Sequence, residues 1–466
     1  MACPLRFSSY FHLLPEEVVF DTDFGREKTV KDVEESFLKE ARWSPDGSTV
    51  MTVAGGDCMS FFNADPTLVK ERQYYQTTTE NDQTLATRNM TDSHPYTGLD
   101  AGSGNTWHMG STVMDSCWYP FMNSADPASS CYLTACRDKP IHLWNFEPAS
   151  ELNEDGSGYR CDTANTKTGA GTDKNTSIPT SRCSYRCYNQ YDEVETVQAI
   201  SFNSTGDKIY ACTKNLIRIF DVNTPGRECT AIPTIRFKKD PMGMFKGLIS
   251  SVVFNPDPSM KVYSCGTYSN SVAVYVEGSK ESVLMLADVP TGCGITCQRW
   301  NPNGNHLWVG GRHSNDIICY DLRTTRGELG RVSRKLDTNQ RLTFDLDPWG
   351  KYLITGSQDG EVLVYDAIDF SLQHRIVDDT HGMDCTNSVT CHPHSALLCV
   401  ATGQRSVDCD SDDDSEDDDK EGTESDRMNI TPAAPGASAK ASKSSGLHLL
   451  EIGAEKLGCP AESSAA

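Results

Sequence analysis

The sequence lacks the segments that carry a chain into or across a membrane. It has no run of about eighteen apolar residues, and Met1 is not followed by the charged stretch and apolar core of a secretory signal. We therefore expect neither a membrane protein nor a secreted one. The 19 cysteines follow no regular spacing, and several lie inside apolar runs, which predicts reduced core thiols in a nuclear or cytosolic protein.

Motifs of common enzyme and metal sites are also missing. No Gly-rich phosphate loop follows a predicted strand and opens a helix. Cysteines and histidines gather between Cys385 and Cys399, but no Cys-x-x-Cys pair occurs, and strand alternation would send near neighbours to opposite faces. The sequence thus predicts a protein that is not an enzyme and that holds no cofactor and no metal.

What the sequence does contain is a repeated tight turn. Its four clearest copies are Asn255-Pro256, Asn301-Pro302, Asp347-Pro348 and His392-Pro393, at steps of 46, 46 and 45 residues. An alternating apolar run precedes each turn and a second run follows it, and in most copies a third run ends in an aromatic residue. A period of this size with several short strands per unit is typical of WD-repeat β-propellers.

The first half of the chain contains the same phrase around Trp43, Trp118 and Phe202. Together with the four turns, these copies predict an all-β fold, a seven-bladed WD-repeat β-propeller with disordered insertions. The seventh blade has no third strand close to its first two. The best candidate for that strand lies far downstream, at residues 447–452.

The predicted organisation has four parts. Residues 1–34 form an N-terminal segment that could contribute the closing strand, and residues 35–405 form the blades. Residues 406–445 are a disordered acidic and low-complexity insertion, and residues 446–466 supply the last strand and a tail. The chain therefore forms one domain with long insertions.

The insertion holds much of the net charge of −23, because residues 408–426 contain twelve acids and one lysine. A block of like charge this dense is expected to stay solvated and disordered. Within it, Ser411 and Ser415 are each followed by acids up to the third position, which predicts phosphorylation by an acid-directed kinase. The added charge would compete with the phosphates of a bound ligand for nearby cations, although an inert solubilising loop is an equally open reading.

Several loop and strand-end phrases resemble the telomerase Cajal body protein 1 family of WD-repeat proteins. A generic WD repeat would not dictate residue identity at most of these places. The phrases occupy residues 37–39, 116–119, 139–144, 188–193, 225–229, 338–341, 344–348, 384–387 and 402–405.

The resemblance implies a non-catalytic scaffold that recognises the CAB-box loop of box H/ACA small Cajal body RNAs and telomerase RNA. It implies as partners these RNAs and the protein subunits of the H/ACA and telomerase particles, with no membrane and no direct DNA contact. It implies that the protein is located in the nucleus, in Cajal bodies, with a cytoplasmic pool also open.

One rim of the propeller is the predicted RNA-binding surface. The loop from the second to the third strand and the loop entering the next blade lie on one face, where cations, rings and amides suit single-stranded RNA. The other reading is that these side chains only satisfy turn backbones or pair with nearby aspartates. The predicted residues are Arg137, Lys139, Tyr188, Asn189, Lys214, Tyr268, Arg312, His313, Asn339, Gln340, Arg341, Asn387 and Arg405.

A second function remains open. Tyr320-Asp321-Leu322-Arg323 resembles the phrase with which WD-repeat substrate receptors dock on a cullin-type ubiquitin ligase, with Tyr in place of Trp. Arg323 would be the docking residue, or it would pair within the propeller. Recovery of RNA after crosslinking would separate the two functions.

Overall fold

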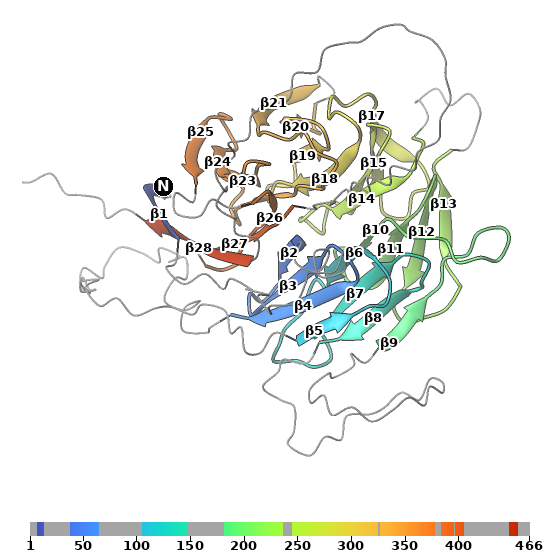
Figure 1. Ribbon diagram of the computed structural model, residues 1–466. Helices are drawn as coiled ribbons and strands as arrows, with labels where there is room; N and C mark the ends of the chain where they lie inside the picture. Colours follow the sequence, from blue (N-terminus) through green and yellow to red (C-terminus); the bar gives the residue numbers. More distant parts are fainter. Residues whose placement is uncertain are drawn as a thin grey trace, which may run out of the picture.

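The structure is a computed structural model whose described residues form 28 strands in seven four-stranded sheets. It describes residues 7–13, 38–64, 105–146, 181–235, 245–324, 327–377, 384–395, 397–404 and 447–454. Figure 1 shows the sheets arranged as blades around a ring. The prediction of an all-β, seven-bladed propeller is confirmed. No helix among the described residues is long and apolar enough to cross a membrane.

The strands of the first four blades follow the chain from the centre of the ring outward. Blade 1 contains β2 (Leu38–Trp43), β3 (Thr49–Ala54), β4 (Cys58–Asn63) and β5 (Asn105–His108). Blade 2 contains β6 (Val113–Trp118), β7 (Cys131–Cys136), β8 (Ile141–Asn145) and β9 (Ser181–Tyr185). Blade 3 contains β10 (Ala199–Phe202), β11 (Lys208–Cys212), β12 (Leu216–Asp221) and β13 (Thr230–Pro233). Blade 4 contains β14 (Ile249–Phe254), β15 (Val262–Thr267), β16 (Val272–Val276) and β17 (Ser282–Leu286).

The last three blades complete the ring. Blade 5 contains β18 (Ile295–Trp300), β19 (His306–Gly311), β20 (Asp316–Asp321) and β21 (Glu328–Ser333). Blade 6 contains β22 (Phe344–Leu346), β23 (Tyr352–Gly356), β24 (Val362–Asp366) and β25 (Leu372–Ile376). Blade 7 contains β26 (Thr386–Cys391), β27 (Leu397–Thr402), β28 (Leu447–Ala454) and, outermost, β1 (Phe7–Leu13).

Blade 7 brings together the two ends of the described chain. Its third strand, β28, pairs with β27 through Leu398 opposite Leu450, and with β1 through Leu13 opposite Leu450. The N-terminal strand thus covers an edge of the sheet that would otherwise expose unpaired backbone groups. Residues 406–445, predicted as a disordered insertion, lie outside the described residues.

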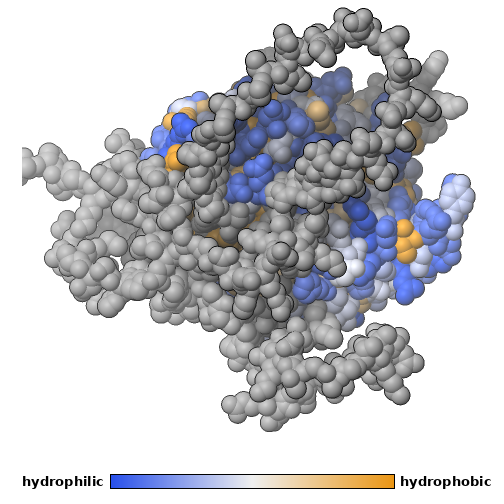
Figure 2. Space-filling model, in the orientation of Figure 1, coloured by the Kyte–Doolittle hydropathy of each residue, from blue (hydrophilic) through white to orange (hydrophobic). Residues whose placement is uncertain are grey.

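The hydrophobic core lies between neighbouring blades, where alternating apolar side chains of two sheets meet. Between blades 1 and 2, the ring of Phe61 lies 4.9 Å from that of Trp107, 5.8 Å from that of Trp118 and 5.0 Å from that of Tyr132, measured between centroids. These tilted and edge-on contacts are the preferred geometries of aromatic pairs. On the face seen in Figure 2, the described surface is mainly hydrophilic, with scattered apolar residues.

The repeated turns join neighbouring blades at several junctions. In blade 4, the Asn255 side chain donates a hydrogen bond to the Gly304 carbonyl of blade 5 at 2.7 Å. In blade 5, Asn301 donates to the Gly350 carbonyl of blade 6 at 2.8 Å. A Cβ atom on Gly304 would lie 2.9 Å from the Asn255 Oδ1 atom, and Gly304 has a φ of +71°. Two constraints therefore require glycine at position 304: its backbone conformation and the close approach of the Asn255 side chain.

His392 makes the same contact where blade 7 meets blade 1. Its Nε2 lies 3.0 Å from the Gly47 carbonyl, and its Nδ1 accepts a hydrogen bond from the His394 backbone at 2.9 Å. These partners require a neutral ring with its hydrogen on Nε2. Burial lowers the pKa of His392 from 6.5 to about 4.

We expect His392→Asn to make the propeller less sensitive to acid, because Asn supplies the equivalent contact in blades 4 and 5. Between pH about 6.5 and 4, unfolded wild type binds a proton at His392 that the folded state does not bind. The free energy of unfolding therefore decreases as the pH is lowered through this range. From pH 7.5 to pH 5 the variant should lose about 2 kcal/mol less than wild type. Urea unfolding at both pH values measures the difference.

The comparison must be made between variant and wild type, because Asp347 acts in the opposite sense. Burial raises the pKa of Asp347 from 3.8 to about 6. Between these two pH values the folded state holds a proton that the unfolded state has lost. That contribution is present in both proteins and cancels. Equal losses of stability in the two proteins would show that His392 is not the acid-sensitive group.

Candidate nucleic-acid interface

One face of the propeller collects the loops from second to third strands and the loops that enter the next blade. We call it the top face. Backbone hydrogen bonds join these loops: Met109 donates to Asp57 at 2.9 Å, and Arg137 donates to Thr112 at 2.9 Å. Its described loops include residues 55–57, 109–112, 137–140, 186–198, 213–215, 268–271, 287–294, 312–315, 334–343 and 357–361.

All predicted rim residues that the structure describes lie in these loops, except Asn387, which lies near the start of β26. Arg137 and Lys214 are exposed, and neither side chain has a partner among the described residues. Lys139 donates to the Met109 carbonyl at 2.8 Å. Arg405, Ser411 and Ser415 lie outside the described residues.

Two of the predicted aromatic residues are stacked with arginines. The Arg312 guanidinium lies 4.6 Å from the centroid of the Tyr268 ring, while its Nε donates to the Cys293 carbonyl at 3.1 Å. The Arg227 guanidinium lies 4.4 Å from the centroid of the Tyr188 ring. Planar cations held over rings form flat surfaces on which a base can stack. Arg227 lies in one of the phrases that resemble the family, but it was not among the predicted rim residues, because it comes from a loop of the next blade.

Two predicted amides are occupied by their own surroundings. Asn189 accepts hydrogen bonds from the backbones of Tyr191 and Glu193 and donates to the Glu193 carboxylate at 2.9 Å. Asn387 is fully buried and donates to the Leu38 and Gly403 carbonyls at 2.7 and 2.6 Å. Both arrangements match the structural reading that the sequence left open.

A cavity of 690 Å³ opens where the top face meets the central channel. His313 closes one side, with Nε2 at 2.9 Å from the Asn339 amide oxygen and Nδ1 at 3.3 Å from an Asp337 oxygen. Gln340 donates to the Asn387 amide oxygen at 2.9 Å. We call this cavity the channel mouth. Its lining residues are Lys39, Glu40, Val53, Val113, Met114, Asp115, His313, Asp337, Thr338, Asn339, Gln340, Arg341 and Gln404.

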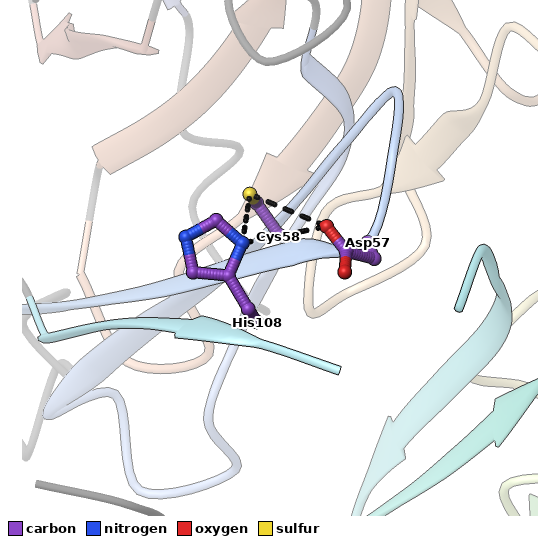
Figure 3. A group of neighbouring side chains, drawn as sticks. All are labelled: Asp57, Cys58 and His108. Atoms are coloured by element: carbon purple, nitrogen blue, oxygen red, sulfur yellow. Dashed lines mark hydrogen bonds and ion pairs between the residues drawn. The ribbon is translucent and has the colours of Figure 1, made fainter. Parts of the chain in front are cut away.

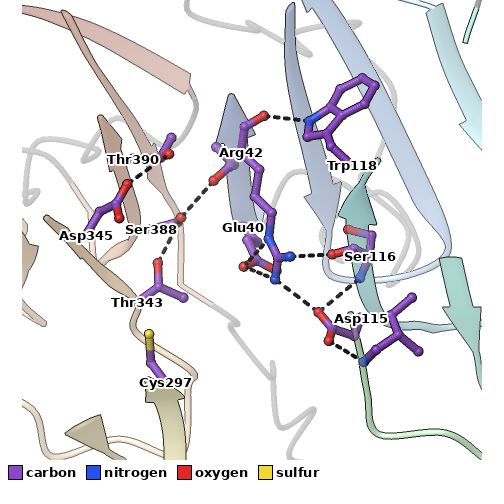
Figure 4. Close-up of polar contacts among 12 residues, drawn as sticks. Glu40, Arg42, Asp115, Ser116, Trp118, Cys297, Thr343, Asp345, Ser388 and Thr390 are labelled. Carbon is purple, nitrogen blue, oxygen red and sulfur yellow. Dashed lines mark hydrogen bonds and ion pairs between the residues drawn. The ribbon is translucent and has the colours of Figure 1, made fainter. Parts of the chain in front are cut away.

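Charged side chains of the inner strands form a network below the mouth (Figure 4). Arg42 on β2 contacts Glu40 at 2.7 Å and Asp115 on β6 at 3.0 Å. The other Asp115 oxygen accepts a hydrogen bond from the Ile200 backbone on β10 at 2.9 Å. Asp115 thus links the inner strands of blades 1, 2 and 3, and its charge is compensated by Arg42.

Asp345 plays the same part on the opposite side of the ring. It lies 3.4 Å from the Arg299 Nε atom in blade 5 and accepts hydrogen bonds from Thr390 and from the Cys391 backbone in blade 7, at 3.3 and 3.0 Å. In both networks an arginine of the preceding blade and a backbone donor of the following blade hold one aspartate. A cavity of 390 Å³ lies between them.

Arg341 connects the two cavities, since it lines both. Its Nε is buried without a hydrogen-bond partner, and its guanidinium has none among the described residues. Burial lowers the pKa of Arg341, but the Glu40 and Asp115 carboxylates outweigh burial and keep that pKa above its usual value. The channel mouth therefore holds a charged planar donor to which the described residues offer no hydrogen-bond acceptor.

Sequence reasoning found Arg341 but missed Glu40, Arg42 and Asp115. The available signal was a charged residue within an otherwise apolar inner strand. Register shifts between Leu38 and Glu40, and between Val113 and Asp115, mark bulges in β2 and β6. Bulges re-aim side chains, so simple alternation could not predict which residues face the channel.

Arg323, the predicted adaptor-docking residue, lies in the loop after β20 on the face opposite the top face. Its guanidinium donates to both carboxylate oxygens of Asp321, at 3.0 and 2.7 Å. The pair is the internal contact that the sequence offered as the other explanation for this residue.

Comparison with known proteins supports the sequence resemblance. A family model described as "WD domain, G-beta repeat" matches residues 338–366. The chain is 28% identical to "Telomerase Cajal body protein 1" of Bos taurus over 374 residues, and 29% identical to the Mus musculus protein of that name over 375 residues. The matches cover 80% of this chain but 58% and 59% of these relatives, so the chain spans less than two thirds of their length. The resemblance to this family is confirmed.

A relative with a different name has a more similar length. It is "Guanine nucleotide-binding protein negative regulator 1" of Schizosaccharomyces pombe, 26% identical over 389 residues, with 82% of this chain and 83% of the relative covered.

We expect Asp115→Ala to lower the free energy of unfolding by about 3 kcal/mol, because Arg42 loses a buried partner and the Ile200 backbone loses its acceptor. The matched control is Asp359→Ala, which removes an exposed carboxylate that pairs with Lys335 at 2.9 Å. That change should cost less than about 1 kcal/mol. Urea unfolding of both variants tests the contrast, and similar losses would contradict a structural role for the channel network.

Proposed function

We propose that this chain is a non-catalytic RNA-binding scaffold of the nucleus. It recognises box H/ACA small Cajal body RNAs through their CAB-box loop, and telomerase RNA, and it retains these particles in Cajal bodies. The observation that carries the proposal is the similarity of 80% of the chain to proteins named Telomerase Cajal body protein 1. Protein subunits of the H/ACA and telomerase particles are the further partners.

The top face supplies the chemistry that a single-stranded RNA loop requires. Arg137 and Lys214 offer unpaired positive charge for phosphates, and Arg312 stacked on Tyr268 offers a flat surface for a base. An unpaired loop can splay its bases, so one base can enter the channel mouth. There Arg341 would donate to a base edge or a phosphate.

An acidic chain can bind RNA when its cations are gathered on one surface, because the local potential rather than the net charge attracts phosphates. The channel carboxylates do not oppose this. Asp115 is buried and compensated by Arg42, and Glu40 is held by the same guanidinium. These two carboxylates are therefore offset, and the exposed Arg137 and Lys214 supply the positive charge that attracts RNA, while Asp337 is an exposed acid at the channel mouth.

We expect Arg137→Ala with Lys214→Ala to weaken RNA binding and to flatten its salt dependence. Each lost phosphate contact in single-stranded RNA lowers the slope of log affinity against log salt by about 0.7, so the double variant should lose about 1.4. Filter binding of a CAB-box stem-loop at several salt concentrations measures the slope.

The matched control is Lys280→Ala with Arg323→Ala, which removes two positive charges from the opposite face. This variant has the same net charge as the top-face variant, so a general electrostatic effect would change both slopes equally. Equal slopes in the two variants would move the RNA site away from the top face.

We expect Arg341→Gln to reduce RNA affinity about tenfold and to lower stability only modestly, because the substitution removes the attraction of the guanidinium to Glu40 and Asp115 but no hydrogen bond among the described residues. Arg341→Lys keeps the charge but not the planar fork, and it should restore only part of the affinity. A drop in stability without a change in affinity would make Arg341 a purely structural residue.

Crosslinking in cells that recovers no RNA with the wild-type chain would contradict the proposed function as a whole.

A further inference from the structure

Three side chains that can bind a metal meet on the top face of blade 1. Asp57 precedes β4, Cys58 is the first residue of β4, and His108 is the last residue of β5. Cys58 and His108 are directly opposite each other in the pairing of these strands. Figure 3 shows the three side chains directed toward one point. The proposed RNA-binding surface does not use any of them.

The donor atoms form a nearly equilateral triangle. The Cys58 Sγ atom lies 3.2 Å from His108 Nδ1 and 3.8 Å from Asp57 Oδ1, and Nδ1 lies 3.4 Å from Oδ1. Zinc bonds of about 2.0 to 2.3 Å place the donors of a tetrahedral site about 3.3 to 3.7 Å apart. The observed separations match one triangular face of such a tetrahedron.

Hydrogen bonds can join these three side chains, and a bound cation is the other arrangement that their geometry allows. The Cys58 thiol donates to Asp57 Oδ1 at 3.8 Å, and a hydrogen on His108 Nδ1 can be donated to the same oxygen. The same Nδ1 atom also lies 3.2 Å from Cys58 Sγ. A catalytic relay would need the two partners on different ring nitrogens, which is not the geometry here. One cation at the centre would bind all three lone pairs.

We propose that Asp57, Cys58 and His108 bind one zinc ion, with the fourth coordination position open to water. A thiolate, an imidazole and a carboxylate are a ligand set that zinc accepts. The second Asp57 oxygen accepts a hydrogen bond from the Gly110 backbone at 2.9 Å, which orients the carboxylate. The thiol is buried while the His108 side chain is 59% exposed, so an ion can enter from solvent.

Binding would convert the Cys58 thiol to a thiolate and release its proton to solvent. The ion would then join β4 to β5 across a sequence separation of 50 residues. Closing a loop of that length restricts the unfolded chain, so the bound ion should stabilise the outer edge of blade 1. The bound ion would therefore link the two outer strands of blade 1 at the edge of the top face.

Cobalt titration of the purified full-length chain tests the site. Wild type should bind one Co²⁺ with the absorption of a tetrahedral thiolate complex, and Zn²⁺ should displace it. Cys58→Ala should remove this absorption, whereas the exposed Cys293→Ala should retain it. His108→Gln and Asp57→Asn should each weaken cobalt binding by more than about tenfold. Loss of a residue that only hydrogen-bonds to a metal ligand already lowers metal affinity by about tenfold or more.

Thermal unfolding gives an independent measurement. Zn²⁺ should raise the melting temperature of wild type and of Cys293→Ala, and at the same zinc concentration it should raise that of His108→Gln by much less. His108 is exposed, so its substitution does not threaten folding. Tetrahedral thiolate absorption that persists in Cys58→Ala, or wild type that shows neither absorption nor zinc stabilisation, would overturn the proposal. RNA binding is not involved in either measurement.

Discussion

Closure of the ring is the constraint on which the rest of this structure depends. Each blade buries its apolar faces only against its neighbours, so an open end would expose a whole sheet. The contact at each junction is local, as where Asn301 donates to the Gly350 carbonyl at 2.8 Å. At the last junction three contacts coincide: His392 meets Gly47, Ser388 donates to Ala41, and Asn387 donates to Leu38. This junction brings β26 of blade 7 beside β2 of blade 1, which lie far apart in the sequence. The three contacts thus hold it from the bottom to the top of the channel.

The repeat was predictable because the same physical requirement recurs at several blades. Where the side chain before the proline reaches the next blade's turn, as at Gly47, Gly304 and Gly350, that turn has a glycine at positive φ. The top-face loops were predictable for a related reason, since antiparallel strands alternate in direction. Arg137, Lys214 and Arg312 could therefore be assigned to one face from the strand order alone.

The remaining features depend on contacts that spacing does not encode. Bulges in β2 and β6 decide that Glu40 and Asp115 face the channel. The pairing of β28 with β1 joins segments from opposite ends of the sequence. Cys58 and His108 become neighbours only through the register of β4 and β5. In each case, residues far apart in the chain are brought together by strand register.

Ring closure and the channel mouth share side chains, which links stability to the proposed RNA site. Gln340 donates to Asn387 and to the Gly403 carbonyl, at 2.9 and 3.2 Å, and so belongs to the contacts that tie blade 6 to blade 7. Arg341 follows it directly in the chain, and its Nε has no hydrogen-bond partner among the described residues. Closure of the ring therefore helps to set the position of Arg341 at the channel mouth. A ligand that bound Arg341 would bind only the closed ring, and by mass action it would stabilise that state.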